Sequence, residues 1–245
     1  VAWYRRKLDI TTDDQGKSIY LDIDGAMSYA MVWFNGHLIG GWPYGYNSFR
    51  LDLTPYLNYG EKNQLAIRID NPNHSARWYP GGGIYRNVWL TKVAPVHLGQ
   101  WGTFITTPKV SNKEATINLS LKLENKTTTK QTVEVKTQIF VLDNFGKAKG
   151  KAIAVFSTEN INIKANGQEI KESKIVLKNP KLWGAYPTQK QNLYIARTSL
   201  FIAGKQVDEY DTTFGIRKIE FHPTKGLLVN GEKIKIQGVN QHHDL

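Results

Sequence analysis

The sequence predicts an all-β protein made of two consecutive β-sandwiches, and three observations support this prediction. Apolar and polar residues alternate with a period of two in many short stretches, which is the pattern of half-buried strands. No long stretch shows the apolar period of about 3.6 residues that marks an amphipathic helix. Turn dipeptides such as Asn35-Gly36 separate the stretches, and Asn-Gly favours a two-residue hairpin turn because both residues tolerate positive φ.

The first predicted sandwich spans residues 1–97. Its strands are expected at residues 19–23, 30–34, 49–53, 65–69 and 88–90. The second of these stretches is apolar at every position, which is typical of a strand between packed layers. Six of the seven tryptophans lie in residues 1–101, so we expect an aromatic core or an aromatic surface. Trp33 and Trp89 lie inside predicted strands, and core packing is the favoured interpretation for both.

The second predicted sandwich spans residues 98–218. Alternating stretches recur with a turn roughly every 8–12 residues, the spacing of an immunoglobulin-like sandwich of about seven strands. The strands are expected at residues 117–123, 133–141, 153–156, 174–177, 193–201 and 206–210.

The chain closes with a predicted hairpin whose turn is Asn230-Gly231 and whose second strand is residues 233–236. Polar residues, including His242, follow that strand. In a (β/α)₈ barrel, strand ends of this kind carry the residues that handle substrates. We therefore interpret residues 219–245 as the opening of a barrel, and we expect the chain to be the non-catalytic front portion of a larger enzyme, cut at both ends.

The net charge of +11 is concentrated in the second predicted sandwich. Residues 98–218 hold 19 Lys and Arg against 10 Asp and Glu, and only Arg197 and Arg217 are arginines. The lysines are scattered at alternate strand positions, which favours a solvated sheet face that resists edge pairing. A nucleic-acid groove would need clustered cations interleaved with aromatic rings, so no nucleic-acid partner is expected.

Composition also excludes several kinds of site. The chain has no cysteine, which excludes disulfides, thiolate zinc sites and cysteine nucleophiles. No run approaches the roughly 18 consecutive apolar residues of a membrane span. His242 and His243 are adjacent on a predicted strand end, where neighbouring side chains point to opposite faces, so a zinc site made by both is disfavoured.

Four segments, taken in this order, resemble glycoside hydrolase family 2, most closely its β-galactosidase branch. Together they cover nearly the whole chain. They are Asp24-Gly25-Ala26 leading to Val32-Trp33-Phe34-Asn35-Gly36; residues 77–88, which read RWYPGGGIYRNV; Pro180-Lys181-Leu182-Trp183 with Leu193-Tyr194 and Phe214-Gly215-Ile216-Arg217; and Leu228-Val229-Asn230-Gly231 followed by residues 238–244, which read GVNQHHD.

The resemblance implies a sugar-binding jelly roll, then an immunoglobulin-like domain, then the first strand of a truncated catalytic barrel. It also implies a retaining mechanism run by two glutamates further along the barrel. Retaining hydrolysis needs two carboxyl groups about 5–5.5 Å apart. Asp244 is the only carboxylate beside the histidine pair, and no Asn-Glu dipeptide of the family's acid/base kind occurs. We therefore expect the acid/base and nucleophile glutamates to lie beyond Leu245, with no catalytic residue in this chain and no hydrolysis by it alone.

The resemblance also implies which residues touch substrate. His242 matches a family histidine that contacts the sugar at the cleavage subsite, although capping of the strand end is the alternative. His243 and Asp244 are interpreted as supporting or packing residues. In the second motif we expect Arg77, Trp78 and Asn87 to bind substrate.

The chemistry of the second motif supports that expectation. Trp78 can stack on the apolar face of a sugar, with core packing as an equal alternative, and Arg77 can bond hydroxyl groups. Well-known relatives carry a carboxylate where this chain has Arg77, so the charge at this position is reversed. For Arg86 the favoured interpretation is a buried ion pair within the jelly roll.

The leading functional hypothesis is the accessory region of a β-galactosidase-like hydrolase acting on terminal β-D-galactosides. Specificity for β-glucuronides or β-mannosides stays open, because a uronic acid would give Arg77 a carboxylate partner. The alternative from another class is a pair of carbohydrate-binding modules that work without hydrolysis. The expected partner is a carbohydrate. No metal or cofactor is expected in this segment, while Mg or Na ions and homo-oligomerisation in the parent enzyme are left open. Exported relatives favour a periplasmic or secreted location.

Overall fold

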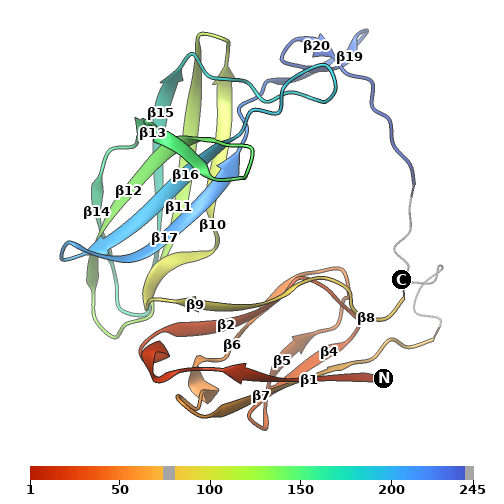
Figure 1. The fold of residues 1–245 in the computed structure, drawn as a ribbon, viewed down its shortest axis with the longest axis vertical. Coiled ribbons are helices and arrows are strands. Elements are labelled where there is room, and N and C mark those ends of the chain that lie inside the picture. Colours follow the sequence, from red (N-terminus) through yellow and green to blue (C-terminus); the bar gives the residue numbers. More distant parts are fainter. Residues whose placement is uncertain (74–80, 241–245) are drawn as a thin grey trace. The chain divides into compact units, whose positions relative to one another are not determined.

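The computed structural model describes residues 1–73 and 81–240, and it is all-β over those residues (Figure 1). The predicted fold class is confirmed. None of the described helical turns is long or apolar enough to cross a bilayer. The chain divides into two compact units: among the described residues, unit 1 comprises residues 1–94 and 238–240, and unit 2 comprises residues 95–237.

Unit 1 is a sandwich of two antiparallel sheets with an additional strand pair (Figure 1). One sheet has the order β1-β7-β4-β5, the other has the order β6-β2-β9, and β3 pairs with β8. The strands are β1 (Ala2–Asp9), β2 (Ser18–Ile23), β3 (Ala26–Met27), β4 (Ala30–Phe34), β5 (His37–Trp42), β6 (Phe49–Asp52), β7 (Lys62–Ile69), β8 (Gly83–Ile84) and β9 (Val88–Val93); short 3₁₀ helices lie at Thr12–Asp14 and Thr54–Tyr56.

The core of unit 1 is a cluster of buried apolar side chains contributed by both sheets. Phe34 and Ile67 come from the first sheet, and Leu21 comes from the second. Burial alternates along β7, so the period of two seen in the sequence is the period with which side chains enter this core. Strand β2, the central strand of its sheet, is buried at every position.

The buried carboxylate of Asp22 links all three strands of the second sheet. It accepts hydrogen bonds from Arg50 Nε at 2.6 Å and Arg50 Nη2 at 2.9 Å on β6, and from Thr91 Oγ1 at 2.6 Å on β9. The Arg50 guanidinium also lies 4.7 Å from the centre of the Tyr20 ring. A buried charge is tolerated when it is paired and hydrogen-bonded, as it is here.

The predicted hairpin turn at Asn35-Gly36 is formed, with φ of +48° and +85°. The buried side chain of Asn63 supports it. Asn63 Oδ1 accepts from Asn35 Nδ2 at 2.8 Å and from the Asn58 amide at 2.9 Å. Asn63 Nδ2 donates to the carbonyls of Asn58 at 2.7 Å and Glu61 at 3.1 Å. Both ends of this amide are therefore satisfied without water.

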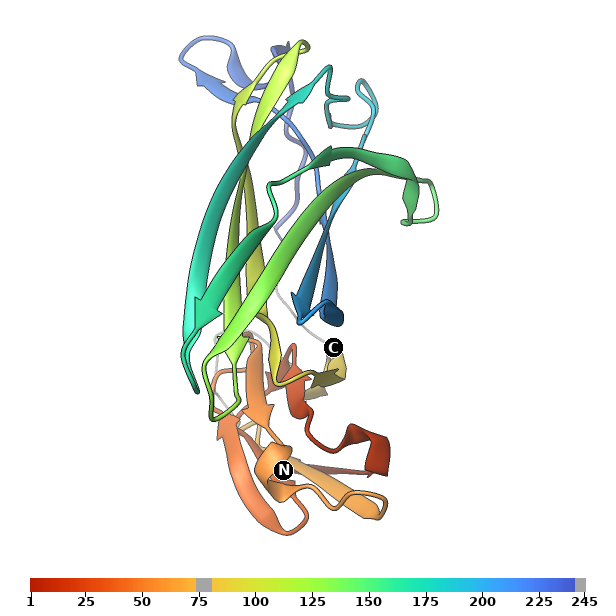
Figure 2. The same cartoon turned by 90° about the vertical axis from the view of Figure 1, so that its left-hand side faces the viewer.

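Unit 2 is a second antiparallel sandwich, with sheets β10-β11-β15 and β13-β12-β16-β17 and with β14 paired to β12 (Figures 1 and 2). This arrangement agrees with the predicted immunoglobulin-like sandwich. Its strands are β10 (Val96–Val110), β11 (Glu114–Asn125), β12 (Gln131–Leu142), β13 (Ala148–Val155), β14 (Glu159–Ile163), β15 (Gln168–Lys178), β16 (Tyr194–Ile202) and β17 (Lys205–Phe214).

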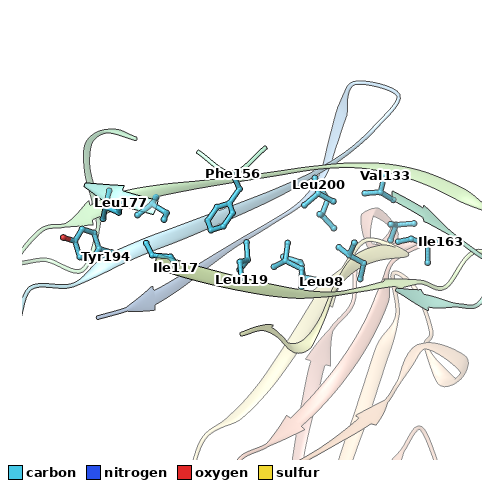
Figure 3. Close-up of a cluster of buried hydrophobic side chains, with 14 of the residues drawn as sticks. Leu98, Ile117, Leu119, Val133, Phe156, Ile163, Leu177, Tyr194 and Leu200 are labelled. Atoms are coloured by element: carbon cyan, nitrogen blue, oxygen red, sulfur yellow. The ribbon is translucent and has the colours of Figure 1, made fainter. Parts of the chain in front are cut away.

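The core of unit 2 is one continuous apolar cluster between its sheets (Figure 3). Alternate residues of β11 enter it, which explains the clean alternation of the sequence there. The labelled members are Leu98, Ile117, Leu119, Val133, Phe156, Ile163, Leu177, Tyr194 and Leu200.

A charged cluster surrounds Glu124 on β11. Lys122 Nζ lies 2.9 Å and Lys126 Nζ lies 3.0 Å from its carboxylate oxygens, and Nε2 of the buried His97 lies 3.9 Å away. Burial alone raises the pKa of this carboxyl, but the hydrogen bonds from the two lysines outweigh burial and lower the pKa to about 2.

The last described strands are β18 (Ile219–His222), β19 (Gly226–Val229) and β20 (Glu232–Lys233), which form a small sheet of their own. The predicted hairpin at Asn230-Gly231 is present, with φ of +54° and +83°. Its second strand is shorter than predicted: the ladder with β19 ends at Lys233, and after it the Ile234 amide donates to the Leu227 carbonyl at 2.9 Å. The assignment of residues 219–245 to a barrel stays a prediction.

Removal of the buried amide should destabilise unit 1. We expect Asn63→Ala to lower the free energy of unfolding by about 2–3 kcal/mol, since it leaves the partly buried backbone groups of Asn58 and Glu61 and the Asn35 amide without their partner. Asn58→Ala is the matched control, because Asn58 is exposed and bonds Asn63 through its backbone. Urea unfolding measures both variants. Equal losses in the two would contradict the role of the Asn63 side chain.

The Glu124 cluster predicts an acid-sensitive contribution to stability. A carboxyl whose folded pKa is depressed stabilises the fold above its ordinary pKa of 4.5 and loses that contribution as the pH falls toward about 2. Glu124→Gln should therefore lower stability at neutral pH and show a smaller further loss between pH about 4.5 and 2. Unfolding curves at several pH values measure this. Glu134→Gln, at an exposed position of β12, should track the unmodified chain.

Candidate functional site

Of the residues predicted to bind substrate, Asn87 alone lies in the described chain. Arg77, Trp78 and His242 fall outside the described residues, so their roles stay predictions. Asn87 is exposed and directly precedes β9, and its carbonyl accepts a hydrogen bond from the Asp24 amide at 3.0 Å. The backbone of Asn87 is therefore fixed, while its side-chain amide faces solvent.

His243 and Asp244, which the sequence analysis interpreted as supporting or packing residues, are also outside the described residues. The supporting roles of His243 and Asp244 therefore stay predictions. The same holds for the expectation that the acid/base and nucleophile glutamates lie beyond Leu245, because the structure describes the chain only as far as residue 240.

Asp24 and Trp89 lie beside Asn87, and together the three residues form an exposed edge of unit 1 at the start of β9. Trp89 Nε1 donates to Asp24 Oδ2 at 2.8 Å, and the Trp89 side chain is 53% exposed. The prediction that Trp89 is a core residue is therefore wrong. Trp89 points to the outer face of β9, and strand periodicity does not tell which face is covered. Trp33 is partly buried and stacks on Trp3, with ring centroids 5.2 Å apart.

Tyr85 anchors the described end of the second motif. Its hydroxyl donates to the carbonyl of Gly45 at 2.9 Å, and burial raises the pKa of that hydroxyl. Gly25 makes room for the ring, because a Cβ at residue 25 would lie 2.8 Å from Tyr85 Cζ. The guanidinium of Arg86 lies 5.2 Å from the centre of the same ring.

Arg86 does not form the buried ion pair that the sequence suggested. The side chain is exposed, and within the described residues its contact is the face of Tyr85. A planar guanidinium over an aromatic ring is a common arrangement for arginine. In this arrangement the outer edge of the Arg86 guanidinium is exposed to solvent, next to Asn87 in the sequence.

The glycines of the second motif allow close backbone approach. Gly81 has φ of +67° and accepts a hydrogen bond from Asn71 Nδ2 at 2.5 Å. Gly83 has φ of +104° and pairs with Met27, and a Cβ at residue 83 would lie 2.8 Å from the Tyr4 hydroxyl. Both backbone conformations favour glycine.

A second feature of unit 1 was not predicted from the sequence: an aromatic hollow of about 550 Å³ beside strands β4, β5 and β7. Tyr29 and Trp42 provide its exposed rings, and Arg68 and Asp70 provide its charged groups. Its remaining lining residues are Ala30, Met31, Leu38, Gly40, Gly41, Pro43 and Pro72. The hollow joins residues about 40 positions apart, so no local motif signals it.

No group of three or more His, Asp and Glu side chains suited to a metal ion occurs among residues 1–73 and 81–240. The buried carboxylates of this part of the chain are Asp14 and Asp22. Hydrogen bonds from Lys92 and Lys17 hold the pKa of Asp14 well below its ordinary value. That direction is opposite to the raised pKa of a general acid in glycoside hydrolysis.

Comparison with known protein families identifies the chain. The model described as "Glycosyl hydrolase 2 galactose-binding domain-like" matches residues 1–79, and the model described as "Glycosyl hydrolases family 2" matches residues 96–217. The chain belongs to glycosyl hydrolase family 2. The resemblance seen in the four sequence motifs is therefore confirmed.

Family 2 relatives with two specificities are similar to this chain. The β-galactosidase BoGH2A of Bacteroides ovatus is 37% identical over 246 residues, which cover 100% of this chain and 28% of the relative. A putative β-glucuronidase of Formosa agariphila is 34% identical over 244 residues, which cover 99% of this chain and 22% of the relative. The chain thus spans about a quarter of the length of these curated relatives.

Solved family 2 structures share the fold. A family 2 member from Bacteroides cellulosilyticus aligns with a TM-score of 0.84 at 30% identity, covering 94% of this chain and 30% of that one. A family 2 β-glucuronidase aligns with a TM-score of 0.86 at 29% identity, covering 98% of this chain and 26% of that one.

The contact between Gly25 and Tyr85 gives a stability prediction. We expect Gly25→Ala to lower the free energy of unfolding by about 1–3 kcal/mol, because the Tyr85 ring must move and weaken its bond to Gly45. Gly82→Ala is the matched control, since the nearest atom to its added Cβ is 3.7 Å away. Thermal unfolding measures both. A neutral Gly25→Ala would show that the ring is not tightly held.

Proposed function

We propose that this chain is the non-catalytic N-terminal region of a retaining family 2 glycosidase of the β-galactosidase type. In this role it helps to shape the pocket that receives a terminal β-D-galactoside, and the residues that break the bond lie in another part of the enzyme. The observation that carries the proposal is the match of both units to family 2 models, together with 37% identity to a β-galactosidase over the whole chain.

The chemistry of the described residues supports a non-catalytic role. Retaining hydrolysis needs an acid with a raised pKa and a nucleophilic carboxylate about 5–5.5 Å away. The buried carboxylates available here are engaged in ion pairs: Asp14 with Lys17 and Lys92, and Asp22 with Arg50. These pairs stabilise unit 1 and leave neither group free for proton transfer.

The exposed edge of unit 1 supports the pocket-shaping role. Arg86 and Asn87, at the end of the motif that contains Arg77 and Trp78, present a guanidinium and an amide, and Trp89 presents an indole at the start of β9. Such groups suit hydroxyl recognition and stacking on a sugar ring.

A β-glucuronide is the second candidate substrate. Several relatives are named β-glucuronidases, including one that is 34% identical over 99% of this chain. Arg77, which replaces a carboxylate of well-known β-galactosidases, would pair with a uronic acid carboxylate. The two candidates differ in one testable property, the charge of the preferred sugar.

Hydrolysis assays separate these proposals. The 245-residue chain should release no nitrophenol from nitrophenyl β-D-galactoside or nitrophenyl β-D-glucuronide, whereas the complete product of its gene should prefer the galactoside by at least about tenfold. Turnover by the 245-residue chain would refute its non-catalytic role. Preference for the glucuronide, lost in Arg77→Ala but retained in part by Arg77→Lys, would replace the first candidate with the second.

A further inference from the structure

Strand β15 is an edge strand of unit 2 with a long and regular backbone. Its 11 residues pair with β11 in one uninterrupted antiparallel register, and among the described residues no strand pairs with its other side. In Figure 2 this strand, drawn in teal, runs along one side of unit 2. An edge strand carries a row of backbone N–H and C=O groups that a further strand can bind.

The other described edges of unit 2 have features that oppose edge pairing. The ladders of β10, β13 and β17 each contain a register shift, and β14 has only five residues. Bulges and short length protect an edge, whereas a long edge without bulges accepts another strand. Strand β15 is about twice the usual strand length of 5–6 residues, and its ladder has no shift.

Edge lysines usually oppose pairing, but two of the three lysines of β15 are engaged within the chain. Lys171 pairs with Glu159 of β14, and Lys178 pairs with Glu114 of β11. Lys174 and Glu172 have no ion pair in the part of the chain that the structure describes. These two residues lie on the same face of the strand, two positions apart, so the edge presents one cation and one anion side by side.

The exposed face of β15 also carries apolar side chains. Ile170 is 64% exposed and Val176 is 49% exposed, whereas Ile175 and Leu177 belong to the opposite face and pack in or against the core. Alternation therefore fixes which face a pairing strand would continue. Exposed β-branched residues gain stability when they lie opposite similar residues on a neighbouring strand.

The residues of β15 are complementary to those of a second β15 that runs in the opposite direction. Antiparallel pairing centred on Ser173 places Glu172 opposite Lys174 of the second copy and Ile170 opposite Val176 of that copy. Two-fold symmetry makes each pair occur twice. In this register no position of β15 meets a like charge. A shift of the centre by one residue in either direction places Glu172 opposite itself or Lys174 opposite itself, so like charges select the register.

We propose that β15 is a self-association edge at which two copies of the chain pair in antiparallel orientation. The sheets β10-β11-β15 of the two copies then form one continuous sheet, through backbone hydrogen bonds between the two edges. The complementary charges commit the edge to a second copy of the chain. This inference goes beyond the proposed function, because it concerns unit 2 and does not depend on which glycoside the enzyme cleaves.

Sedimentation velocity of the 245-residue chain over a range of concentrations tests the edge, and we expect a monomer–dimer equilibrium. Lys174→Glu and Glu172→Lys each place like charges opposite each other twice, so each should weaken dimerisation by at least about tenfold. The double variant Glu172→Lys/Lys174→Glu restores opposite charges and should return the dissociation constant to within about threefold of that of the unmodified chain. Lys151→Glu, at an exposed position of β13, is the matched control for net charge.

The double variant separates loss of pairing from loss of folding or a change in net charge. A chain that stays monomeric at every concentration would overturn the proposal. Association that persists in both single variants would also overturn it, since another surface must then be responsible. A loss in the single variants that the double variant does not restore, or an equal loss in Lys151→Glu, would contradict the register. None of these results bears on hydrolysis by the complete enzyme.

Discussion

The arrangement of unit 1 depends on the buried carboxylate of Asp22. Because it bonds Arg50 on β6 and Thr91 on β9, one side chain holds three strands in register. Removal of one partner from a buried pair of this kind typically costs about 3–5 kcal/mol, so the register is strongly specified. Asn87 and Trp89 lie at the end of these strands. The position of the exposed edge is thus fixed from within the sheet.

The positive charge of unit 2 has a structural explanation. Several of its strand lysines pair with glutamates: Lys122 pairs with Glu124 on the same strand, and Lys178 of β15 pairs with Glu114 directly opposite it on β11. Cross-strand pairs of this kind contribute modestly to stability and keep exposed sheet faces and edges soluble. The lysines of unit 2 lie on several strands of both of its sheets.

Much of the fold was predictable because alternation and turn chemistry are local. The turns at Asn35-Gly36 and Asn230-Gly231 and the strands of β11 and β12 follow directly from the sequence. Which face of a strand is buried depends on residues that are far away in the sequence, and this is why Trp89 was wrongly predicted to lie in the core. The extent of β20 depends on a neighbouring strand rather than on its own sequence. Motif resemblance predicted Asn87 as a residue of the candidate site. The aromatic hollow is assembled from separate strands around Tyr29, whose left-handed backbone conformation no local pattern predicts.

The contact between Gly25 and Tyr85 has a consequence for how this family diverges. The space that a methyl group at position 25 would occupy is already filled by the phenol ring, and that ring is tied to the Gly45 carbonyl. A larger residue at position 25 is compatible with the fold once position 85 becomes smaller. Among family members, a side chain at position 25 should therefore be accompanied by a smaller residue at position 85.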